Sequence, residues 1–225
     1  YAFNPYPLNS YGLSHLKNEE WMNTPYSDVL GAKCLNTISI NPSNINQVFI
    51  SSFFSGLLEV NAKVPTILYN QTNSGLESLV LPTNPNYIDI RVGPSAFDNN
   101  GLLWTVTSLI NKPLKSYNPE SRQWRSYALT GIISDGFDDN GYGELVIGND
   151  NSKWIGSNSH GVIGFNESNG NPQIKSLKGE DENMPNDHVT ALAIDKRNQL
   201  WIGTSRGLRV LYNTSAFFTD DNVRA

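Results

Sequence analysis

The sequence is poor in cysteine, in positive charge and in long apolar runs. Cys34 is the single cysteine, which excludes an internal disulfide, and its position beside an apolar strand predicts a small buried side chain. A net charge of −5 without a cluster of Lys or Arg argues against binding to nucleic acid or to an anionic membrane surface. No apolar run approaches the ~20 residues that a membrane-spanning helix needs.

The composition is that of a globular domain. Hydrophobic residues make up 38% and charged residues 16%, which indicates an Asn- and Ser-rich surface around a core and not a disordered chain. At 225 residues the chain can bury a substantial core. It opens at Tyr1 without a secretory signal, and a signal that was removed or lies upstream is compatible with this start.

Residues 186–213 show most clearly how the chain is organised. Three short apolar strands follow one another there, joined by polar turns that leave no room for a helix. This pattern predicts an up-and-down antiparallel meander. The expected strands are His188–Ile194, Gln199–Thr204 and Leu208–Tyr212.

The same pattern recurs upstream at a period near 50 residues. Its aromatic positions, at spacings of 47, 50 and 55 residues, are Trp201, Trp154, Trp104 and Phe49. An Asn that follows an apolar residue lies 12 residues after the aromatic in three repeats and 14 after Trp104; these are Asn61, Asn118, Asn166 and Asn213. Glycines six or seven residues after the aromatic are Gly56, Gly161 and Gly207.

Four short strands per unit at this period are typical of a β-propeller. One such sheet cannot bury both of its faces, so neighbouring blades must pack on either side, and a large flat side chain fills the gap between twisted sheets. The aromatic residues of the repeat are therefore expected to act as wedges between blades. The alternative is a β-sandwich, which also has short strands at regular intervals.

The predicted fold is all-β, an incomplete β-propeller of about four to four and a half blades with four antiparallel strands each. The expected units are a half blade at 1–28, blades at 34–70, 87–128 and 142–177, and a blade at 187–219 with Ser215–Thr219 as its outer strand. Propeller rings usually close with about 4–8 blades. Nothing after Tyr212 supplies the two inner strands that the half blade lacks, so we expect a segment of a larger propeller in preference to a closed four-bladed ring.

Several segments resemble the two-component regulator propeller repeat. They are Val189–Asp195, Gln199–Thr204 and Gly207-Leu208, with a partial echo in Lys153–Ser157 and Gly161-Val162. Phe53–Val60 and Thr214–Val223 resemble the branch of this family formed by PorZ-type proteins of type IX secretion systems. In that branch the repeat continues past such a segment into further blades.

The resemblance implies a non-catalytic binding and assembly protein in the periplasm or at the cell surface of a Gram-negative bacterium. Its implied partners are other secretion-complex proteins, with lipopolysaccharide or a glycan as the ligand class, and it implies no cofactor. One alternative within the family is the periplasmic carbohydrate-sensing domain of a hybrid two-component system. A further alternative is a propeller glycosidase or lyase, which needs convergent carboxylates, or His with a metal, at the channel mouth; only Asp89 is a candidate.

No catalytic set or metal motif is visible in the residues. The acidic segment 135–141 does not have the spacing of a calcium loop, and its Gly, Asp and Asn content favours a polar turn. His15, His160 and His188 share no metal-ligand spacing. The sequence therefore predicts neither catalytic nor metal-binding residues.

Four residues are candidates for ligand binding. His160 and Arg206 each precede the repeat glycine, so we expect them on the same rim, on turns that are free to vary. Asp89 and Arg91 alternate with apolar residues in Tyr87–Val92, the expected innermost strand of its blade, and would line the central channel. The alternatives are a solvated turn for the first pair and charges that only solvate the channel for the second.

Overall fold

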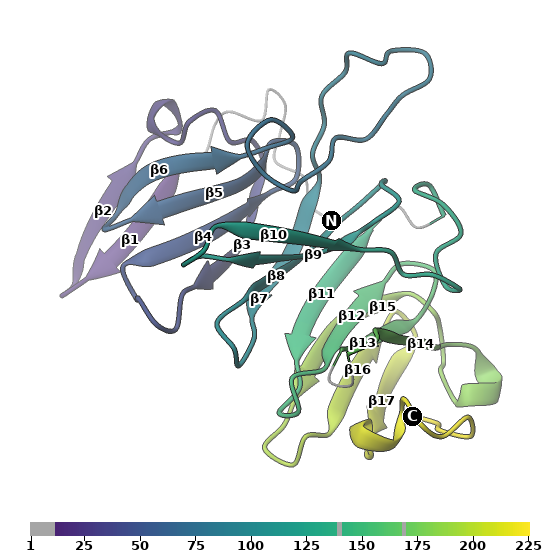
Figure 1. The fold of residues 1–225 in the computed structure, drawn as a ribbon. Coiled ribbons are helices and arrows are strands. Elements are labelled where there is room, and N and C mark those ends of the chain that lie inside the picture. Colours follow the sequence, from purple (N-terminus) through teal and green to yellow (C-terminus); the bar gives the residue numbers. More distant parts are fainter. Residues whose placement is uncertain (1–11, 139–140, 168–169) are drawn as a thin grey trace.

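The computed structural model describes residues 12–138, 141–167 and 170–225, which form five antiparallel sheets (Figure 1). The start of the expected unit 1–28 and two residues of the acidic segment, 139–140, lie outside the described residues. Short 3-10 segments are the only helical structure in the described part of the chain: η1 (Tyr26–Asp28), η2 (Glu180–Glu182) and η3 (Thr214–Ala216). Among these residues no helix is both long enough and apolar enough to cross a membrane. The prediction of an all-β fold is confirmed.

Three of the sheets are complete four-stranded blades in which chain order is also spatial order. One consists of β3 (Leu35–Ile40), β4 (Gln47–Ser52), β5 (Gly56–Asn61) and β6 (Val64–Tyr69). The next consists of β7 (Val92–Phe97), β8 (Leu103–Thr107), β9 (Leu114–Asn118) and β10 (Gln123–Tyr127). The third consists of β11 (Tyr142–Ile147), β12 (Lys153–Ser157), β13 (Val162–Asn166) and β14 (Gln173–Leu177).

The two remaining sheets lie at the ends of the described chain and have fewer strands. One pairs β1 (Leu13–Lys17) with β2 (Glu20–Thr24), and the other joins β15 (Val189–Ile194), β16 (Leu200–Thr204) and β17 (Gly207–Leu211). The first strands β3, β7, β11 and β15 are neighbours, so they form the inner ends of successive blades. Open sheets arranged in this way form a partial β-propeller, as predicted.

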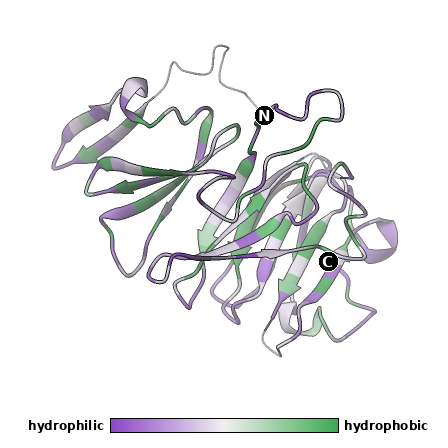
Figure 2. Cartoon of the chain, turned by 45° about the horizontal axis from the view of Figure 1, so that its top comes forward, coloured by the Kyte–Doolittle hydropathy of each residue, from purple (hydrophilic) through white to green (hydrophobic). Residues whose placement is uncertain are grey.

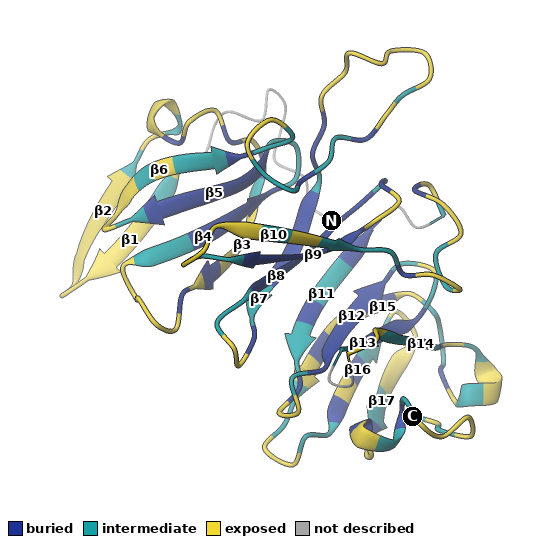
Figure 3. Ribbon diagram, viewed as in Figure 1, coloured by how far each residue is buried: buried dark blue, intermediate teal, exposed yellow. Residues whose placement is uncertain are grey.

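Hydrophobic residues lie along the strands (Figure 2), and buried residues concentrate on the second and third strands of the three complete blades (Figure 3). Every residue of β8 and β12 is buried, whereas β1 and β2 are mostly exposed. Cys34 is buried, as the sequence predicted. Burial therefore increases where a sheet has neighbours on both faces.

Two expected strands are wrong. The inner strand of the second complete blade is Val92–Phe97 and not Tyr87–Val92. Gly93 and Pro94 hide this strand from sequence patterns, and the structure tolerates them at an irregularity in the pairing between Val92 and Ser95. The expected outer strand Ser215–Thr219 is instead the 3-10 turn η3 and the residues after it.

The turn replaces the strand because the Phe217 ring enters the core. Phe217 is fully buried, and its ring lies 4.9 Å from that of Trp154. The Asn213 side chain accepts a hydrogen bond from the Ala216 N–H at 3.1 Å, which stabilises the turn. A β-strand over this segment would break that capping bond.

The repeat aromatics occupy equivalent positions in the second strands. Their partners on the first strands are in register: Ser39 with Phe49, Ala96 with Trp104, Val146 with Trp154 and Ala193 with Trp201. Phe49, Trp104 and Trp154 are 0% exposed. Each of the first two meets an aromatic ring of the next blade, Phe49 with Tyr117 at 5.8 Å and Trp104 with Phe165 at 5.5 Å. Trp201 is 40% exposed, because no further sheet covers it in the described structure.

The indole N–H of each repeat Trp is bound to the turn between the first two strands. Trp104 donates to Asp98 at 2.8 Å, as Trp201 does to Asp195 at 3.2 Å. Trp154 donates to the Ser152 hydroxyl at 2.8 Å because Gly148 occupies the place of the Asp in this blade. The wedge is therefore fixed at both its ring and its polar end, as a buried indole requires.

Replacing Trp154, which lies between two sheets, is expected to lower the free energy of unfolding much more than replacing Trp201, which has no sheet beyond it. Trp154→Ala should lower the free energy of unfolding by about 3–5 kcal/mol through lost burial and a cavity, and Trp201→Ala by less than half of that. Urea unfolding followed by circular dichroism measures both. Equal losses for the two variants would contradict the wedge assignment.

Candidate functional site

One edge of the blades gathers the turns between second and third strands and the segments that enter the first strands. In each blade an N–H after the second strand donates to the carbonyl before the first strand. These bonds run from Phe53 to Cys34, Ser108 to Arg91, Asn158 to Gly141 and Ser205 to His188, at 3.0 to 3.1 Å. We call this edge the turn face. It consists of the turns 53–55, 108–113, 158–160 and 205–206 and of the entering residues 89–91, 138, 141 and 187–188. All four predicted ligand-binding residues lie on it.

Arg91 is held in a fixed orientation on the turn face. Its Nε and Nη2 atoms both donate to Oδ2 of Asp89, at 3.0 and 2.9 Å. The guanidinium lies 5.6 Å from the ring centre of Phe53 and 5.7 Å from that of Phe54, within the range of cation–π attraction. The Asp89 side chain is fully buried and that of Arg91 is 25% exposed. The pair is therefore a buried anchor with a partly exposed cationic end.

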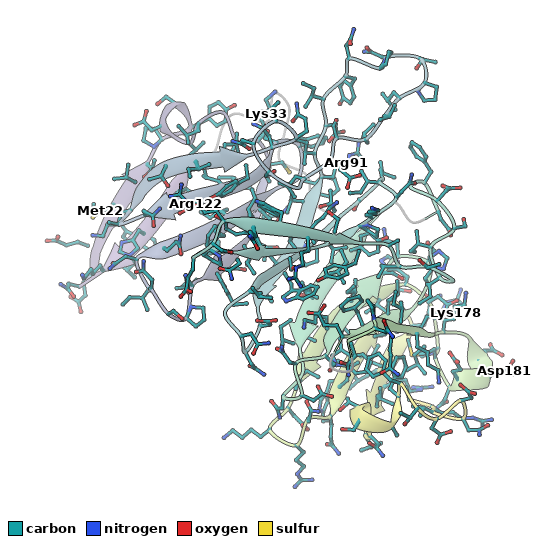
Figure 4. All side chains as sticks on the ribbon, viewed as in Figure 1. Met22, Lys33, Arg91, Arg122, Lys178 and Asp181 are labelled. Carbon is teal, nitrogen blue, oxygen red and sulfur yellow. The ribbon has the colours of Figure 1, made fainter. Side chains whose placement is uncertain are left out.

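The expectation that Asp89 and Arg91 belong to the innermost strand of their blade is wrong, because that strand begins after them, at Val92. Ile90 forms a parallel bridge with Ser55, and its carbonyl accepts from Gly56 N–H at 3.2 Å. The Asp89 N–H donates to the Ser78 hydroxyl at 2.9 Å. The contacts of Ile90 dock the segment onto the turn of the preceding blade, and the bond between Asp89 and Ser78 closes the base of the β6–β7 connection. Arg91 lies at the base of the long β6–β7 connection that projects from the molecule (Figure 4).

His160 is paired with a carboxylate from the connection that precedes its blade. Its Nε2 lies 3.1 Å from Oδ1 of Asp138, and its side chain is 13% exposed. Nδ1 is buried and has no hydrogen-bond partner among the described residues. The backbone N–H of Ser134, which donates to Asp138 at 2.6 Å, lowers the pKa of that carboxyl, and His160 lowers it further.

Arg206 lies alone on a short turn. The turn between β16 and β17 has two residues, and the Arg206 N–H donates to the Thr204 hydroxyl at 3.2 Å. Its side chain is exposed and has no polar partner in the described part of the chain. The structure thus brings Asp89 together with Arg91, and places His160 and Arg206 on separate blades of the same face.

Sequence reasoning missed the partners of these residues. Phe53 and Phe54 are distant from Arg91 in the chain, and only the bridge between Ser55 and Ile90 brings them together. Asp138 was visible as part of an acidic segment, but nothing in the spacing linked it to His160. The aromatic pair directly after a second strand was the one available signal.

The acidic segment uses its described carboxylates in turns. Asp135 accepts from the Phe137 N–H at 2.7 Å, as Asp138 does from Ser134. Within residues 12–138, 141–167 and 170–225, no three His, Cys, Asp or Glu side chains gather closely enough to hold a metal ion.

Comparison with known proteins confirms the repeat and the fold. Residues 183–206 match the family described as "Two component regulator propeller". PorZ of Porphyromonas gingivalis, an essential surface component of its type IX secretion system, is 21% identical with a TM-score of 0.76, over 90% of this chain and 29% of PorZ. The extracellular domain of the putative one component system BT4673 from B. thetaiotaomicron is 17% identical with a TM-score of 0.62, over 90% of this chain and 25% of that one.

A propeller enzyme has a similar fold as well. Virginiamycin B lyase from Staphylococcus aureus is 15% identical with a TM-score of 0.62, over 96% of this chain and 66% of the lyase. No curated protein matches the chain by sequence. The chain thus spans less than a third of PorZ and of the BT4673 domain, and at these identities the likeness establishes the fold alone.

The Asp138 carboxyl is expected to titrate below the ordinary aspartate pKa of about 3.9, because the Ser134 N–H stabilises its charged form. Since the folded-state pKa is the lower one, the carboxylate favours the folded turn above the unfolded pKa, and this contribution is lost as the pH falls through the folded pKa. An NMR titration that follows the chemical shift of the Asp138 carboxyl carbon measures this pKa. Ser134→Pro, which lacks the N–H, should raise the pKa; an Asp138 midpoint at the ordinary value in the unmodified chain would contradict the assignment.

Proposed function

We propose that the chain is a non-catalytic binding and assembly module, part of a periplasmic or surface-exposed propeller protein that works with other components of a type IX secretion system. The likeness to PorZ supports this choice among propeller functions. The observation that carries the binding role is the arrangement of Arg91 on the turn face.

The Arg91 arrangement suits contact with another protein. Two of the five guanidinium N–H groups are used by Asp89, and Nη1 has no partner among the described residues. A planar donor held beside two aromatic rings costs little entropy when it binds, and Arg and aromatic residues dominate the energetics of protein interfaces. A carboxylate of the partner is the group that the planar guanidinium of Arg91 binds best, because its two oxygens match the spacing of the N–H donors.

The β6–β7 connection extends the same surface. Val80, Tyr87 and Ile88 are 65%, 41% and 59% exposed on this projecting loop. The loop is held at its base by the Leu79 N–H, which donates to the Asp89 carbonyl at 3.0 Å. Apolar side chains beside a cation with a fixed orientation give the mixed chemistry of a protein interface.

The test is site-specific cross-linking in the full-length protein. A photoreactive aromatic amino acid in place of Tyr87 should cross-link to secretion-complex subunits, whereas one at Tyr212, 71% exposed on the opposite edge, should not. Arg91→Ala should reduce co-purification, because removing an interface residue worth about 2 kcal/mol raises the dissociation constant about 30-fold. Arg197→Ala, an exposed Arg on the opposite edge, is the matched control and should leave it unchanged. Equal cross-linking from both edges, or equal loss in both Arg variants, would argue against a turn-face partner.

A second candidate is the extracellular sensing domain of a hybrid two-component system. The repeat match at 183–206 favours it, as does the likeness to the extracellular domain of BT4673, which is also described as a putative hybrid two component system. It requires a membrane helix and a histidine kinase in the same full-length polypeptide, and a ligand in the central cleft. The flanking gene sequence distinguishes the two: a covalently continuous kinase would select the sensor.

A further inference from the structure

The turns between first and second strands follow one another along the edge opposite the turn face (Figure 1). They span residues 41–47, 98–102, 148–152 and 195–199. In each turn the N–H of the first residue donates to the carbonyl of the last, at 2.8 to 3.1 Å: Asn41 to Gln47, Asp98 to Leu102, Gly148 to Ser152 and Asp195 to Gln199. The N–H of the fourth residue donates back to the carbonyl of the first, at 2.9 to 3.1 Å. These shared bonds align the four turns position by position.

Successive turns are linked by one kind of hydrogen bond at two of the three interfaces. The backbone N–H of the second residue of a turn donates to the side-chain oxygen of the fourth residue of the next turn. Asn99 donates to Asn151 at 3.0 Å, and Asn149 donates to Asn198 at 2.8 Å. Asn151 and Asn198 both have positive φ, 67° and 60°, a conformation that Asn tolerates. An Asn at the fourth position thus ties each blade to the one before it.

The first pair of turns lacks both halves of this link. The second residue of the turn 41–47 is Pro42, which has no backbone N–H to donate. The fourth residue of the turn 98–102 is Gly101, whose φ of 77° matches that of the two Asn residues but which has no side chain to accept. A hollow of about 580 Å³ opens here, and Pro42 and Gly101 both line it. Because both turns belong to complete four-stranded blades, this hollow is built into an interface within the chain.

The hollow offers neutral hydrogen-bonding groups beside apolar surface. Its lining consists of Ile40, Pro42, Ser43, Phe97, Asp98, Asn99, Asn100 and Gly101. The Ser43 hydroxyl and the Asn100 carboxamide, one from each turn, are exposed and form no hydrogen bond with other described residues. Both groups can donate and accept, so both are available to a ligand.

Asp98 is the one charged residue in the lining, and its carboxylate is already used. One oxygen accepts from two backbone N–H groups of its own turn, at 2.9 and 3.0 Å. The other accepts from the Trp104 indole at 2.8 Å and from the Asn151 carboxamide at 3.3 Å, and it lies 3.5 Å from the ammonium of Lys153. The charge is therefore compensated within the interface, and the lining favours a neutral ligand over an ion.

We propose that the hollow binds one neutral pyranose ring of a glycan. Sugar hydroxyls donate and accept hydrogen bonds, as the Ser43 hydroxyl and the Asn100 carboxamide do. Pro42 and Phe97 supply apolar surface for the C–H face of the ring. The volume lies within the roughly 300–1,000 Å³ of small-ligand sites. A bound ring bridges these two turns in the place where an Asn side chain bridges the others.

Saturation-transfer difference NMR on the full-length protein tests the proposal. The probes are methyl β-D-glucopyranoside, methyl α-D-mannopyranoside and methyl β-D-galactopyranoside, neutral rings that differ in the orientation of their hydroxyls. We expect saturable transfer to the ring C–H protons of at least one probe. Asn100→Ala should reduce this transfer, because it removes a donor and an acceptor from the hollow.

A variant that restores the link fills the hollow. Pro42→Asn combined with Gly101→Asn supplies the N–H and the carboxamide found at the other two interfaces, and a Cβ at Gly101 meets no other part of the chain within 4 Å. This double variant should keep the midpoint of urea unfolding and lose most of the transfer. Asn198→Gly, which removes the link at the last interface and leaves the hollow intact, is the matched control and should keep the transfer. If the double variant unfolds, the exposed substitution Asn100→Ala decides.

The proposal is overturned if none of the three sugars shows transfer, or if the folded double variant keeps all of it. It is also overturned if Asn198→Gly abolishes the transfer as well, because the signal then depends on blade packing and not on the hollow. The measurements need no partner protein and leave the turn face unchanged, so their failure is separable from that of the cross-linking experiment.

Discussion

Aromatic wedges between successive sheets are the interaction on which the structure depends. Phe49, Trp104 and Trp154 are fully buried, each on the second strand of its blade, and each contacts aromatic rings outside its own sheet. Burying such a ring contributes several kcal/mol at about 25 cal/mol per Å² of apolar surface. Because the indole N–H groups bind the turn of their own blade, the wedge also fixes that turn. The opposite edge is left free to vary, which is where the candidate site lies.

The interface around Phe49 is stabilised differently, because a Phe has no N–H to anchor. A buried carboxylate, Glu59, stands opposite Phe49 and accepts bonds from Gln47 at 2.8 Å and Tyr69 at 2.6 Å. The Tyr69 hydroxyl also meets that of Tyr117 in the next blade at 2.7 Å. Burial and the bond with Glu59 raise the pKa of Tyr69. A satisfied polar network thus specifies this interface. The Trp104 interface has a buried ion pair instead, in which Lys153 of the next blade lies 3.5 Å from Asp98 and 4.2 Å from the centre of the Trp104 ring.

The sequence revealed the wedges because few folds repeat a Trp at a period near 50 residues, but it misplaced details that depend on turn length. The repeat Asn predicts that Tyr212, which precedes Asn213, is equivalent to Tyr117 and Phe165. In the structure Leu211 is the residue that pairs with Leu200 and is buried, and Tyr212 is exposed. Trp201 pairs with Val210, nine residues later, whereas Trp154 pairs with Gly164, ten residues later, and the equal spacing from the Trp to the Asn concealed this shift of one residue.

The candidate site was predictable only in part, for a physical reason. His160 and Arg206 could be placed on one rim because they precede repeat glycines, so local pattern fixes them. The environment of Arg91 could not be derived, because Phe53 and Phe54 reach it through a connection whose path no periodicity encodes. The alternation of polar and apolar residues in Tyr87–Val92 predicted a strand. In the structure Ile90 of this segment forms only an isolated bridge with Ser55.

A double-mutant cycle between Trp104 on β8 and Phe165 on β13 tests the central claim most directly, because the two rings meet across blades at 5.5 Å. The free energies of unfolding of Trp104→Leu, Phe165→Leu and the double variant are measured by urea unfolding. Wedge packing predicts a coupling energy of about 0.5–1.5 kcal/mol. Additive losses, within about 0.3 kcal/mol, would show that the rings do not hold the blades together.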